Sequence, residues 1–307
     1  MSITDSSSHK VSPIVLKYCS ISCRVLLSTE EEAVKTAIPK PIKAGIPILL
    51  HEQNAYLGRA NYMLAKFADA LALSWPNTKN LPADIAHELT GIPVRQAFFD
   101  AAETPYRLDS TTTVNLTILG GSQGASILGS LVPDAIAMLE EPLRQRLHIR
   151  QQARPEQIDL LQKRYADLGV TAQLRTFFSD VPELLGNSHL VICRSGASSV
   201  AELAAIGRPA LLLPLPNAMD DHQRVNALQM QDVGGGICLD ETSVSAAALA
   251  TRLIQLLGAP KTLAQMAKSA RSLASPDAAK LIAALAEQLV SLSTSKPTGP
   301  KPTGASA

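Results

Sequence analysis

The chain has 307 residues, enough for two domains, with 28 basic and 27 acidic side chains and only 4% aromatic residues. This near-neutral and aromatic-poor composition provides neither a basic footprint nor a set of stacking rings, so we expect no nucleic-acid partner. The four cysteines lack metal-ligand or disulfide-framework spacing, which favours a reducing compartment. No run approaches the ~20 apolar residues of a membrane-spanning helix, which favours a protein at most peripheral to a membrane.

The first third of the chain changes character at Gly45. Residues 1–45 show no sustained hydrophobic period and contain no earlier glycine. Ile46–Leu50 then predicts a short buried strand, and the polar His51–Asn54 stretch follows it at the end where open α/β sheets bind ligands. A helical rhythm over 61–72 is explained by core packing, and residues 71–75 predict another strand.

A second α/β unit is predicted after a polar boundary at Ala101–Thr113. Val114–Leu119 predicts a strand that leads into the sequence GGSQGA at 120–125. Glycines let the backbone approach a diphosphate closely, and Ser122 can add a hydroxyl donor, although a plain strand-to-helix turn would tolerate the same residues. Strands over 148–152 and 172–177 flank a helix over 154–168, and Ser179 is expected to cap a helix over 181–185.

The most informative stretch runs from His189 to Pro214 and predicts strand, tight turn, helix and strand. The start of the helix offers unpaired N–H groups and the positive end of the helix dipole, which suit phosphate. Ser199 and Glu202 have the spacing of a capping box, so Glu202 could simply reach back to the helix end. Alternatively, Glu202 accepts hydrogen bonds from the vicinal hydroxyls of a ribose.

The carboxyl-terminal part continues the alternation of helices and strands. Asp220–Gln223 is predicted to open a helix, and its acids suit the helix dipole. A strand over 237–239 and helices over 244–257 and 262–270 follow. The last 17 residues, from Ser291, are rich in Pro, Gly, Ser, Thr and Lys and predict a disordered tail.

Five short motifs together resemble the MurG glycosyltransferase family. They are HEQN at 51–54, GIPVR at 91–95, GGSQGA at 120–125, CRSGASSVAE at 193–202 and DDHQRVNA at 220–227. The resemblance spans about residues 45–284 and implies an α/β protein of the GT-B type, two Rossmann-like domains facing a cleft. It also implies inverting transfer of N-acetylglucosamine from UDP-N-acetylglucosamine to undecaprenyl-pyrophosphoryl-N-acetylmuramoyl-pentapeptide, with no built-in metal, at the cytoplasmic face of the bacterial inner membrane.

The resemblance also implies roles for particular residues. Ser122 would touch the donor's diphosphate, Glu202 would bind the ribose hydroxyls, and the backbone near Phe178 would read the uracil edge. Asn54, Arg95 and Gln223 would close on the donor from the cleft walls, although Arg95 in its loop could also be a solvated surface charge. The start of the helix would hold ribose and sugar through Ala197, Ser198, Ser199, Val200, Ala201 and Glu202.

One family feature is not found in this sequence, namely the glycine-rich GGTGGH-type loop that is thought to receive the acceptor and to carry the base. We therefore expect an atypical segment at 1–45 and an incomplete N-terminal acceptor-side domain at 46–105. The donor-binding domain would follow at 106–290, with the tail at 291–307. His51 and Glu52 are the remaining candidates for a base, but neither is assigned as a catalytic residue.

Two further hypotheses stand beside a transferase. The first is a UDP-sugar-binding protein of the same descent that does not catalyse transfer, and the second is a UDP-sugar epimerase of the same fold. A nicotinamide-dependent oxidoreductase would need a dinucleotide glycine fingerprint followed by an acid, and the sequence contains none.

Overall fold

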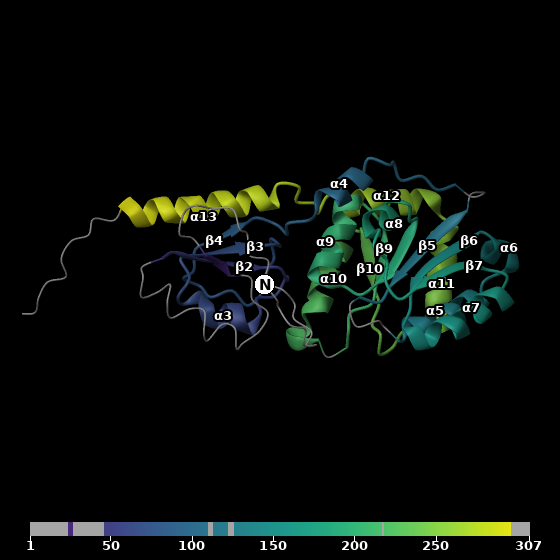
Figure 1. Ribbon diagram of the computed structural model, residues 1–307. Coiled ribbons are helices and arrows are strands. Elements are labelled where there is room, and N and C mark those ends of the chain that lie inside the picture. Colours follow the sequence, from purple (N-terminus) through teal and green to yellow (C-terminus); the bar gives the residue numbers. More distant parts are fainter. Residues whose placement is uncertain (1–23, 27–45, 110–112, 122–125, 217, 296–307) are drawn as a thin grey trace, which may run out of the picture.

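The computed structural model describes residues 24–26, 46–109, 113–121, 126–216 and 218–295, which form two parallel β-sheets with helices around them (Figure 1). The sheets lie side by side, the first built from residues 24–89 and the second from residues 114–238, and we call the parts of the molecule around them the first half and the second half. Both are expected from the alternating strand and helix pattern, because parallel strands need crossover connections.

The first sheet has four strands in the order β1-β2-β3-β4, all paired in parallel. They are β1 (Arg24–Leu26), β2 (Ile48–Glu52), β3 (Ala70–Leu73) and β4 (His87–Leu89). β2 extends beyond its predicted end, so His51 and Glu52 belong to the strand instead of following it. Helix α3 (Arg59–Ala65) is shorter than predicted, because β3 already begins at Ala70.

The second sheet has six parallel strands in the order β10-β9-β8-β5-β6-β7. They are β5 (Val114–Leu119), β6 (Leu147–Gln152), β7 (Thr171–Arg175), β8 (Leu190–Cys193), β9 (Ala210–Leu212) and β10 (Gly236–Cys238). The chain builds outward from β5 in one direction and then returns to place β8 on the other side of β5. This is the strand order of doubly wound nucleotide-binding sheets, which bind ligands beyond the carboxyl ends of the strands where the order reverses.

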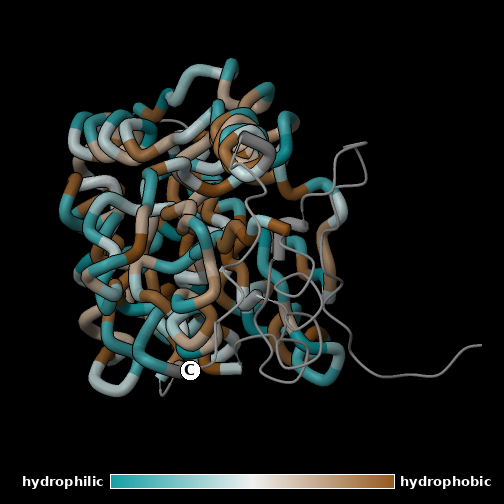
Figure 2. The backbone as a smooth tube through the Cα atoms, turned by 90° about the vertical axis from the view of Figure 1, so that its left-hand side faces the viewer, coloured by the Kyte–Doolittle hydropathy of each residue, from teal (hydrophilic) through white to brown (hydrophobic). Residues whose placement is uncertain are grey.

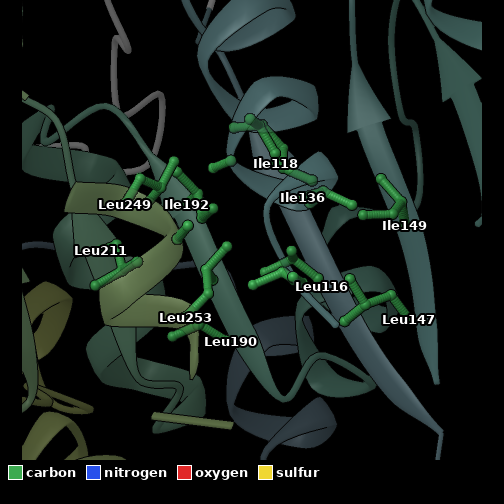
Figure 3. Packing of buried hydrophobic residues seen from close by; sticks show 14 of the residues in the cluster. Leu116, Ile118, Ile136, Leu147, Ile149, Leu190, Ile192, Leu211, Leu249 and Leu253 are labelled. Carbon is green, nitrogen blue, oxygen red and sulfur yellow. The ribbon is translucent and has the colours of Figure 1, made fainter. Parts of the chain in front are cut away.

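Helices cover both faces of the second sheet. They are α5 (Leu128–Ala137), α6 (Glu141–Gln145), η1 (Pro155–Gln157), α7 (Ile158–Asp167), α8 (Val181–Gly186), α9 (Ala197–Ile206), η2 (Met219–Asp221), α10 (His222–Asp232), α11 (Ala246–Leu257) and α12 (Pro260–Arg271). The larger core lies between the sheet and α5, α7 and α11, and the second lies under α8, α9 and α10. Figure 3 shows the larger core, where Leu116 of β5, Leu190 of β8 and Leu253 of α11 are fully buried.

Two helices pack on the half of the molecule opposite to their neighbours in sequence. α4 (Gln96–Ala101) follows the first sheet but buries Phe98 in the core under α8 and α9. α13 (Ala278–Ser295) follows the second sheet but lies along the first (Figure 1), where Ile282 and Leu285 pack with Leu49 of β2. The domain boundaries at 105 and 290 remain predictions, and α13 itself was not predicted.

The ends of two helices differ from the sequence-based expectations. α13 continues through Ser295, so residues 291–295, which were expected in the tail, are helical. At the start of α8, Asp180 occupies the N-cap position and its side chain makes no capping hydrogen bond, so Ser179 does not cap the helix. Residues 1–23, 27–45 and 296–307, which include most of the atypical segment and the rest of the tail, lie outside the described residues.

Hydrophobic segments run mainly through the interior of the chain trace and hydrophilic segments mainly along its outside (Figure 2). Within the described ranges, no helix combines the length and apolar character that crossing a membrane requires.

Candidate functional site

A pocket of about 480 Å³ lies beyond the carboxyl ends of β5 and β8, where the strand order of the second sheet reverses. Three of its lining residues come from different elements: Gly121 lies in the loop after β5, Arg194 directly follows β8, and Glu202 belongs to α9. The remaining lining residues are Leu119, Gln152, Thr176, Phe177, Phe178, Val181, Leu185, Val191, Cys193, Ser199 and Leu203. Fold and pocket therefore agree on one ligand position.

The start of α9 forms one wall of this pocket. Gly196 is the N-cap residue and makes no side-chain capping bond, and Ser199 is the third residue inside the helix. The capping box therefore does not form, because Ser199 would have to stand at the N-cap for it to do so. Ser198 is exposed and Ser199 half-buried, while Ala197, Val200 and Ala201 face the core, so those three could contact a ligand only through their backbone.

Glu202 is left as an acidic group facing the pocket. Burial raises the pKa of its carboxyl group to about 7, while the nearby Arg95 guanidinium acts in the opposite direction. No hydrogen bond to this carboxylate comes from the described residues. A half-buried carboxylate at a pocket wall can accept hydrogen bonds from a diol when it is ionised.

Arg95 precedes α4 and is exposed, with its guanidinium 5.0 Å from the centre of the Phe98 ring. Since α4 packs on the second half, Arg95 comes close enough to Glu202 to influence its charge. The structure thus brings together two predicted site residues that are more than one hundred positions apart in the sequence. Arg95 is a surface charge that also acts on the pocket.

The two phenylalanines after β7 differ in their environment. Phe178 is buried at 3% exposure, with the Arg175 guanidinium 5.7 Å from the centre of its ring, whereas Phe177 is 71% exposed at the edge of the pocket. Such an exposed ring at a pocket rim can stack on a planar ligand group. Ser122, expected at the diphosphate, lies outside the described residues.

Arg194 belongs to the CRSGASSVAE motif, and the sequence alone predicts no role for it. Its guanidinium donates hydrogen bonds to the Leu213 and Pro214 carbonyl oxygens, at 3.1 and 3.3 Å, and pairs with the Glu241 carboxylate. Both side chains of this pair are largely buried. Arg194 therefore ties together the loops that follow β8, β9 and β10, and Glu241 gave no signal in the sequence.

Gln223 is not among the residues that line the pocket. Its Oε1 atom accepts a hydrogen bond from the Leu215 backbone N–H at 3.0 Å and so holds the loop between β9 and α10. In that loop Asp220 and Asp221 both have positive φ angles, 54° and 50°, so their backbone turns sharply before α10 begins. The predicted ligand contact of Gln223 stays a prediction.

The HEQN stretch contributes from the first half. Glu52 is buried and its two carboxylate oxygens accept four hydrogen bonds, from the Asn54 backbone and side chain, the Gly58 backbone and the Asn61 side chain. Asn54 is in turn joined to Asn226 of α10 at 3.1 Å, which connects it to the second half.

His51 is also enclosed. Its Nε2 atom lies 3.0 Å from the Gly91 carbonyl oxygen and 3.2 Å from Ser74 Oγ, and burial lowers its pKa. Both candidate bases are therefore buried residues of β2, and neither side chain is open to an acceptor molecule. Among the described residues no group of His, Cys, Asp or Glu side chains is arranged to hold a metal ion.

Two parallel sheets, one with a pocket at the reversal of its strand order and a partly buried acid near a helix start, define an α/β protein of the GT-B type. The model of the glycosyltransferase family 28 C-terminal domain matches residues 115–282. The chain belongs to this glycosyltransferase family and, within it, to the MurG family.

Two relatives illustrate the match, both named UDP-N-acetylglucosamine--N-acetylmuramyl-(pentapeptide) pyrophosphoryl-undecaprenol N-acetylglucosamine transferase. The protein from Granulibacter bethesdensis is 47% identical over 244 residues, which are 79% of this chain and 64% of the relative. The protein from Paramagnetospirillum magneticum is 44% identical over 250 residues, covering 80% and 67%. The chain thus spans about two thirds of the length of these relatives.

Solved structures agree with the sequence match. The crystal structure of Acinetobacter baumannii MurG has a TM-score of 0.68 and 32% identity, covering 81% of this chain and 68% of that one. A Listeria monocytogenes structure titled as a putative UDP-N-acetylglucosamine 2-epimerase has a TM-score of 0.54 at 14% identity, covering 81% and 69%. At that identity the second likeness concerns the fold alone.

Proposed function

We propose that this chain binds UDP-N-acetylglucosamine in the pocket of the second sheet and transfers its N-acetylglucosamine to undecaprenyl-pyrophosphoryl-N-acetylmuramoyl-pentapeptide. The observation that carries the proposal is the placement of Glu202, a partly buried acid without a hydrogen bond from the described residues, at the pocket beside the start of α9. The names of the relatives supply the donor and the acceptor.

In this proposal each part of the donor meets a different part of the pocket. Glu202 accepts hydrogen bonds from the ribose hydroxyls, and the backbone near Phe178 meets the uracil edge. The diphosphate lies over the loop after β5, which begins at Gly120 and includes Ser122 in the sequence, and beside the positive end of α9. Asn54, Arg95 and Gln223 approach the donor from the walls, and Asn54 and Gln223 meet its sugar.

Departure of UDP leaves negative charge on the diphosphate. Groups that are already oriented toward that charge stabilise it without reorganisation. The N–H groups at the start of α9 and the guanidinium of Arg95 are the described groups suited to this role. A hydroxyl oxygen of the acceptor sugar attacks the anomeric carbon from the side opposite to UDP, the bond between that carbon and the diphosphate oxygen breaks, and the configuration inverts. The hydroxyl proton passes to water.

The lipid-linked acceptor requires contact with a membrane, which we propose is the cytoplasmic face of the bacterial inner membrane. Support comes from α3 and the turn that follows it, where Tyr62, Met63 and Phe67 are 49%, 48% and 44% exposed. Lys66 lies among them, with its ammonium group 4.9 Å from the centre of the Phe67 ring. Exposed apolar side chains next to a cation suit the surface of an anionic bilayer.

A second candidate is a UDP-sugar-binding protein that does not catalyse the transfer. It is favoured by the enclosure of His51 and Glu52 within β2, because a base normally accelerates such a reaction by ~10²–10⁴-fold and neither side chain has an open approach.

Calorimetry and a transfer assay separate these candidates. A transferase is expected to bind UDP-N-acetylglucosamine and to form product only when the lipid-linked acceptor is added. Donor binding without product would favour the binding protein, whereas isomerised donor in the absence of acceptor would indicate an epimerase.

Glu202→Ala tests the placement of the donor itself. It should weaken binding of UDP about tenfold, because two hydrogen bonds to a charged acceptor are lost. Glu183→Ala is the matched control, since Glu183 is an exposed acid in the first turn of α8 and should leave UDP binding unchanged. Equal binding by wild type and Glu202→Ala would refute the assignment of Glu202.

A further inference from the structure

Asn226 lies on α10 at the junction of the two halves and has no exposed surface. It belongs to the DDHQRVNA motif, in which no role was assigned to it. A fully buried amide needs partners for both its oxygen and its nitrogen, so the partners show what the residue holds together.

The side chain of Asn226 makes three hydrogen bonds, two to the first half and one to the second. Its Oδ1 atom accepts from the Ala55 backbone N–H at 2.8 Å. Its Nδ2 atom donates to Asn54 Oδ1 at 3.1 Å and to the Ser195 carbonyl oxygen at 3.3 Å. Residues 54 and 55 follow β2, whereas Ser195 precedes α9, so one amide joins the loop after β2 to the loop before α9.

The orientation of this amide is fixed from two sides. Ala55 presents a backbone N–H, which can only donate, so Oδ1 of Asn226 must face it. Asn54 donates through its own Nδ2 to Glu52 Oε1 at 3.1 Å, which turns Asn54 Oδ1 toward Asn226 Nδ2. Both constraints require the same orientation, and only a side chain that donates and accepts can satisfy them.

A described ion pair between the halves is weaker than these hydrogen bonds. Arg59 Nε lies 3.2 Å from Asp220 Oδ1, but the Arg59 side chain is 75% exposed. Exposed pairs of this kind contribute little to stability, whereas a buried amide with three partners is costly to disturb.

We propose that Asn226 is a positioning residue that sets Asn54 against the start of α9, so that the sugar of the nucleotide donor is recognised only by the docked halves. The inference rests on the proposed function, in which UDP is held by the second half and the sugar also by Asn54. Asn226 itself touches neither. The inference predicts that a change of Asn226 weakens the affinity for UDP-N-acetylglucosamine and leaves the affinity for UDP unchanged.

The test compares UDP with UDP-N-acetylglucosamine binding by calorimetry in wild type and Asn226→Asp. The aspartate keeps the shape of the side chain and the acceptor for Ala55 but can no longer donate to Asn54 or Ser195. We expect UDP affinity to stay within about twofold, and UDP-N-acetylglucosamine affinity to fall about fivefold, which corresponds to ~1 kcal/mol. Asn226→Ser, which is too short to span the junction, should behave in the same way and serves if the aspartate variant does not fold.

Asn115→Asp is the matched control. Asn115 Nδ2 donates to the Asn187 carbonyl oxygen at 2.9 Å within the second half, at the amino end of β5 and away from the pocket. The same change of amide to acid there should alter neither affinity.

A double-mutant cycle with Asn54→Ala separates positioning from general stability. If Asn226 acts through Asn54, the double variant should bind UDP-N-acetylglucosamine about as well as either single variant, so the two effects do not add. Additive effects, equal loss of UDP and UDP-N-acetylglucosamine binding, or unchanged binding of both ligands would overturn the inference. A wild-type chain that binds neither ligand would instead refute the proposed function.

Discussion

Glu202 shows how its environment determines the chemistry of a single side chain. The capping box predicted by its spacing with Ser199 does not form, because α9 begins at Ala197 and places Ser199 inside the helix. Burial then leaves the carboxyl group with a pKa of about 7. Its protonation therefore changes near neutral pH.

This pKa predicts a pH dependence of UDP binding. The ionised carboxylate is the better acceptor for ribose hydroxyls, so a bound ribose should lower the pKa of Glu202 below about 7. UDP affinity should consequently rise from pH 6 to pH 8 and then level off, with protons released on binding near pH 7.

Calorimetry in two buffers with different ionisation enthalpies measures the proton release. Glu202→Gln should remove both the release and the pH dependence. A wild-type affinity that falls as the pH rises through 7 would contradict the prediction.

At the scale of single residues, the fold brings several of the predicted site residues together. Phe178, Ser199 and Glu202 line one pocket and Arg95 lies close to Glu202, while their contacts with a donor stay predictions. The contributions of Glu241 and Asn226 could not be predicted, because each depends on a partner brought near by the fold and neither has a distinctive spacing.

Among the elements, α9 depends on the residue that ends it. Gly207 adopts a left-handed conformation with φ 71°, and its backbone N–H bonds back to the Leu203 and Ala204 carbonyl oxygens. An added Cβ would lie 3.2 Å from both the Ala267 carbonyl oxygen and Arg271 Cβ of α12. The end of α9 and the approach of α12 therefore require a glycine at the same place.

Gly207→Ala should lower the free energy of unfolding by about 2 kcal/mol, because conformational strain and close contact add. Gly169 provides the matched control, since its φ of 68° is similar but an added Cβ meets nothing within 4 Å. Gly169→Ala should cost only the strain, about 1 kcal/mol. Urea unfolding measures both, and equal losses would show that α12 moves aside freely.

α13 should stabilise the first sheet through its buried face. Leu285 is 5% exposed and packs with residues of β2 and β3, whereas Leu281 of the same helix is 48% exposed. Leu285→Ala should reduce the free energy of unfolding by about 2–4 kcal/mol, and Leu281→Ala should change it by less than about 0.5 kcal/mol. Similar losses in the two variants would show that α13 is not docked on the sheet in solution.

Strands were easier to predict than helix ends and long-range packing. β5 has its predicted bounds and β8 begins one residue after its predicted start, because short apolar runs bounded by polar turns leave little choice. α3 was predicted too long because the apolar residues that continue its rhythm are those that begin β3. The packing of α13 on strands more than two hundred residues earlier left no local signal.

In the whole molecule, the two halves share helices and a continuous core. Ala55, Trp75 and Ile92 from the first half are buried in the same cluster as residues of α9 and α10. We therefore expect one cooperative thermal transition for the described part of the chain. Saturating UDP should raise the midpoint temperature of the whole transition. At a ligand concentration one hundred times the dissociation constant, it adds about 2.7 kcal/mol to the free energy of unfolding.

Differential scanning calorimetry checks this prediction by comparing the calorimetric and van't Hoff enthalpies, which should agree. Two resolved transitions, with UDP raising only one, would mean that the shared cluster does not couple the halves. The sequence predicted two α/β units correctly, but the linkage between them depends on contacts that only the fold creates.

Because α4 and α13 each pack on the half opposite to their neighbours in sequence, they determine where the chain can be divided for expression. A fragment that starts after α4 would leave the apolar surface of α8 and α9 without Phe98 and open to water. If that fragment also keeps α13, Ile282 and Leu285 lose the strands that cover them, and both surfaces invite self-association. A piece from Arg95 to Ser275 keeps α4 with the second sheet, whereas the first sheet keeps α13 only when Ala278–Ser295 is expressed together with it.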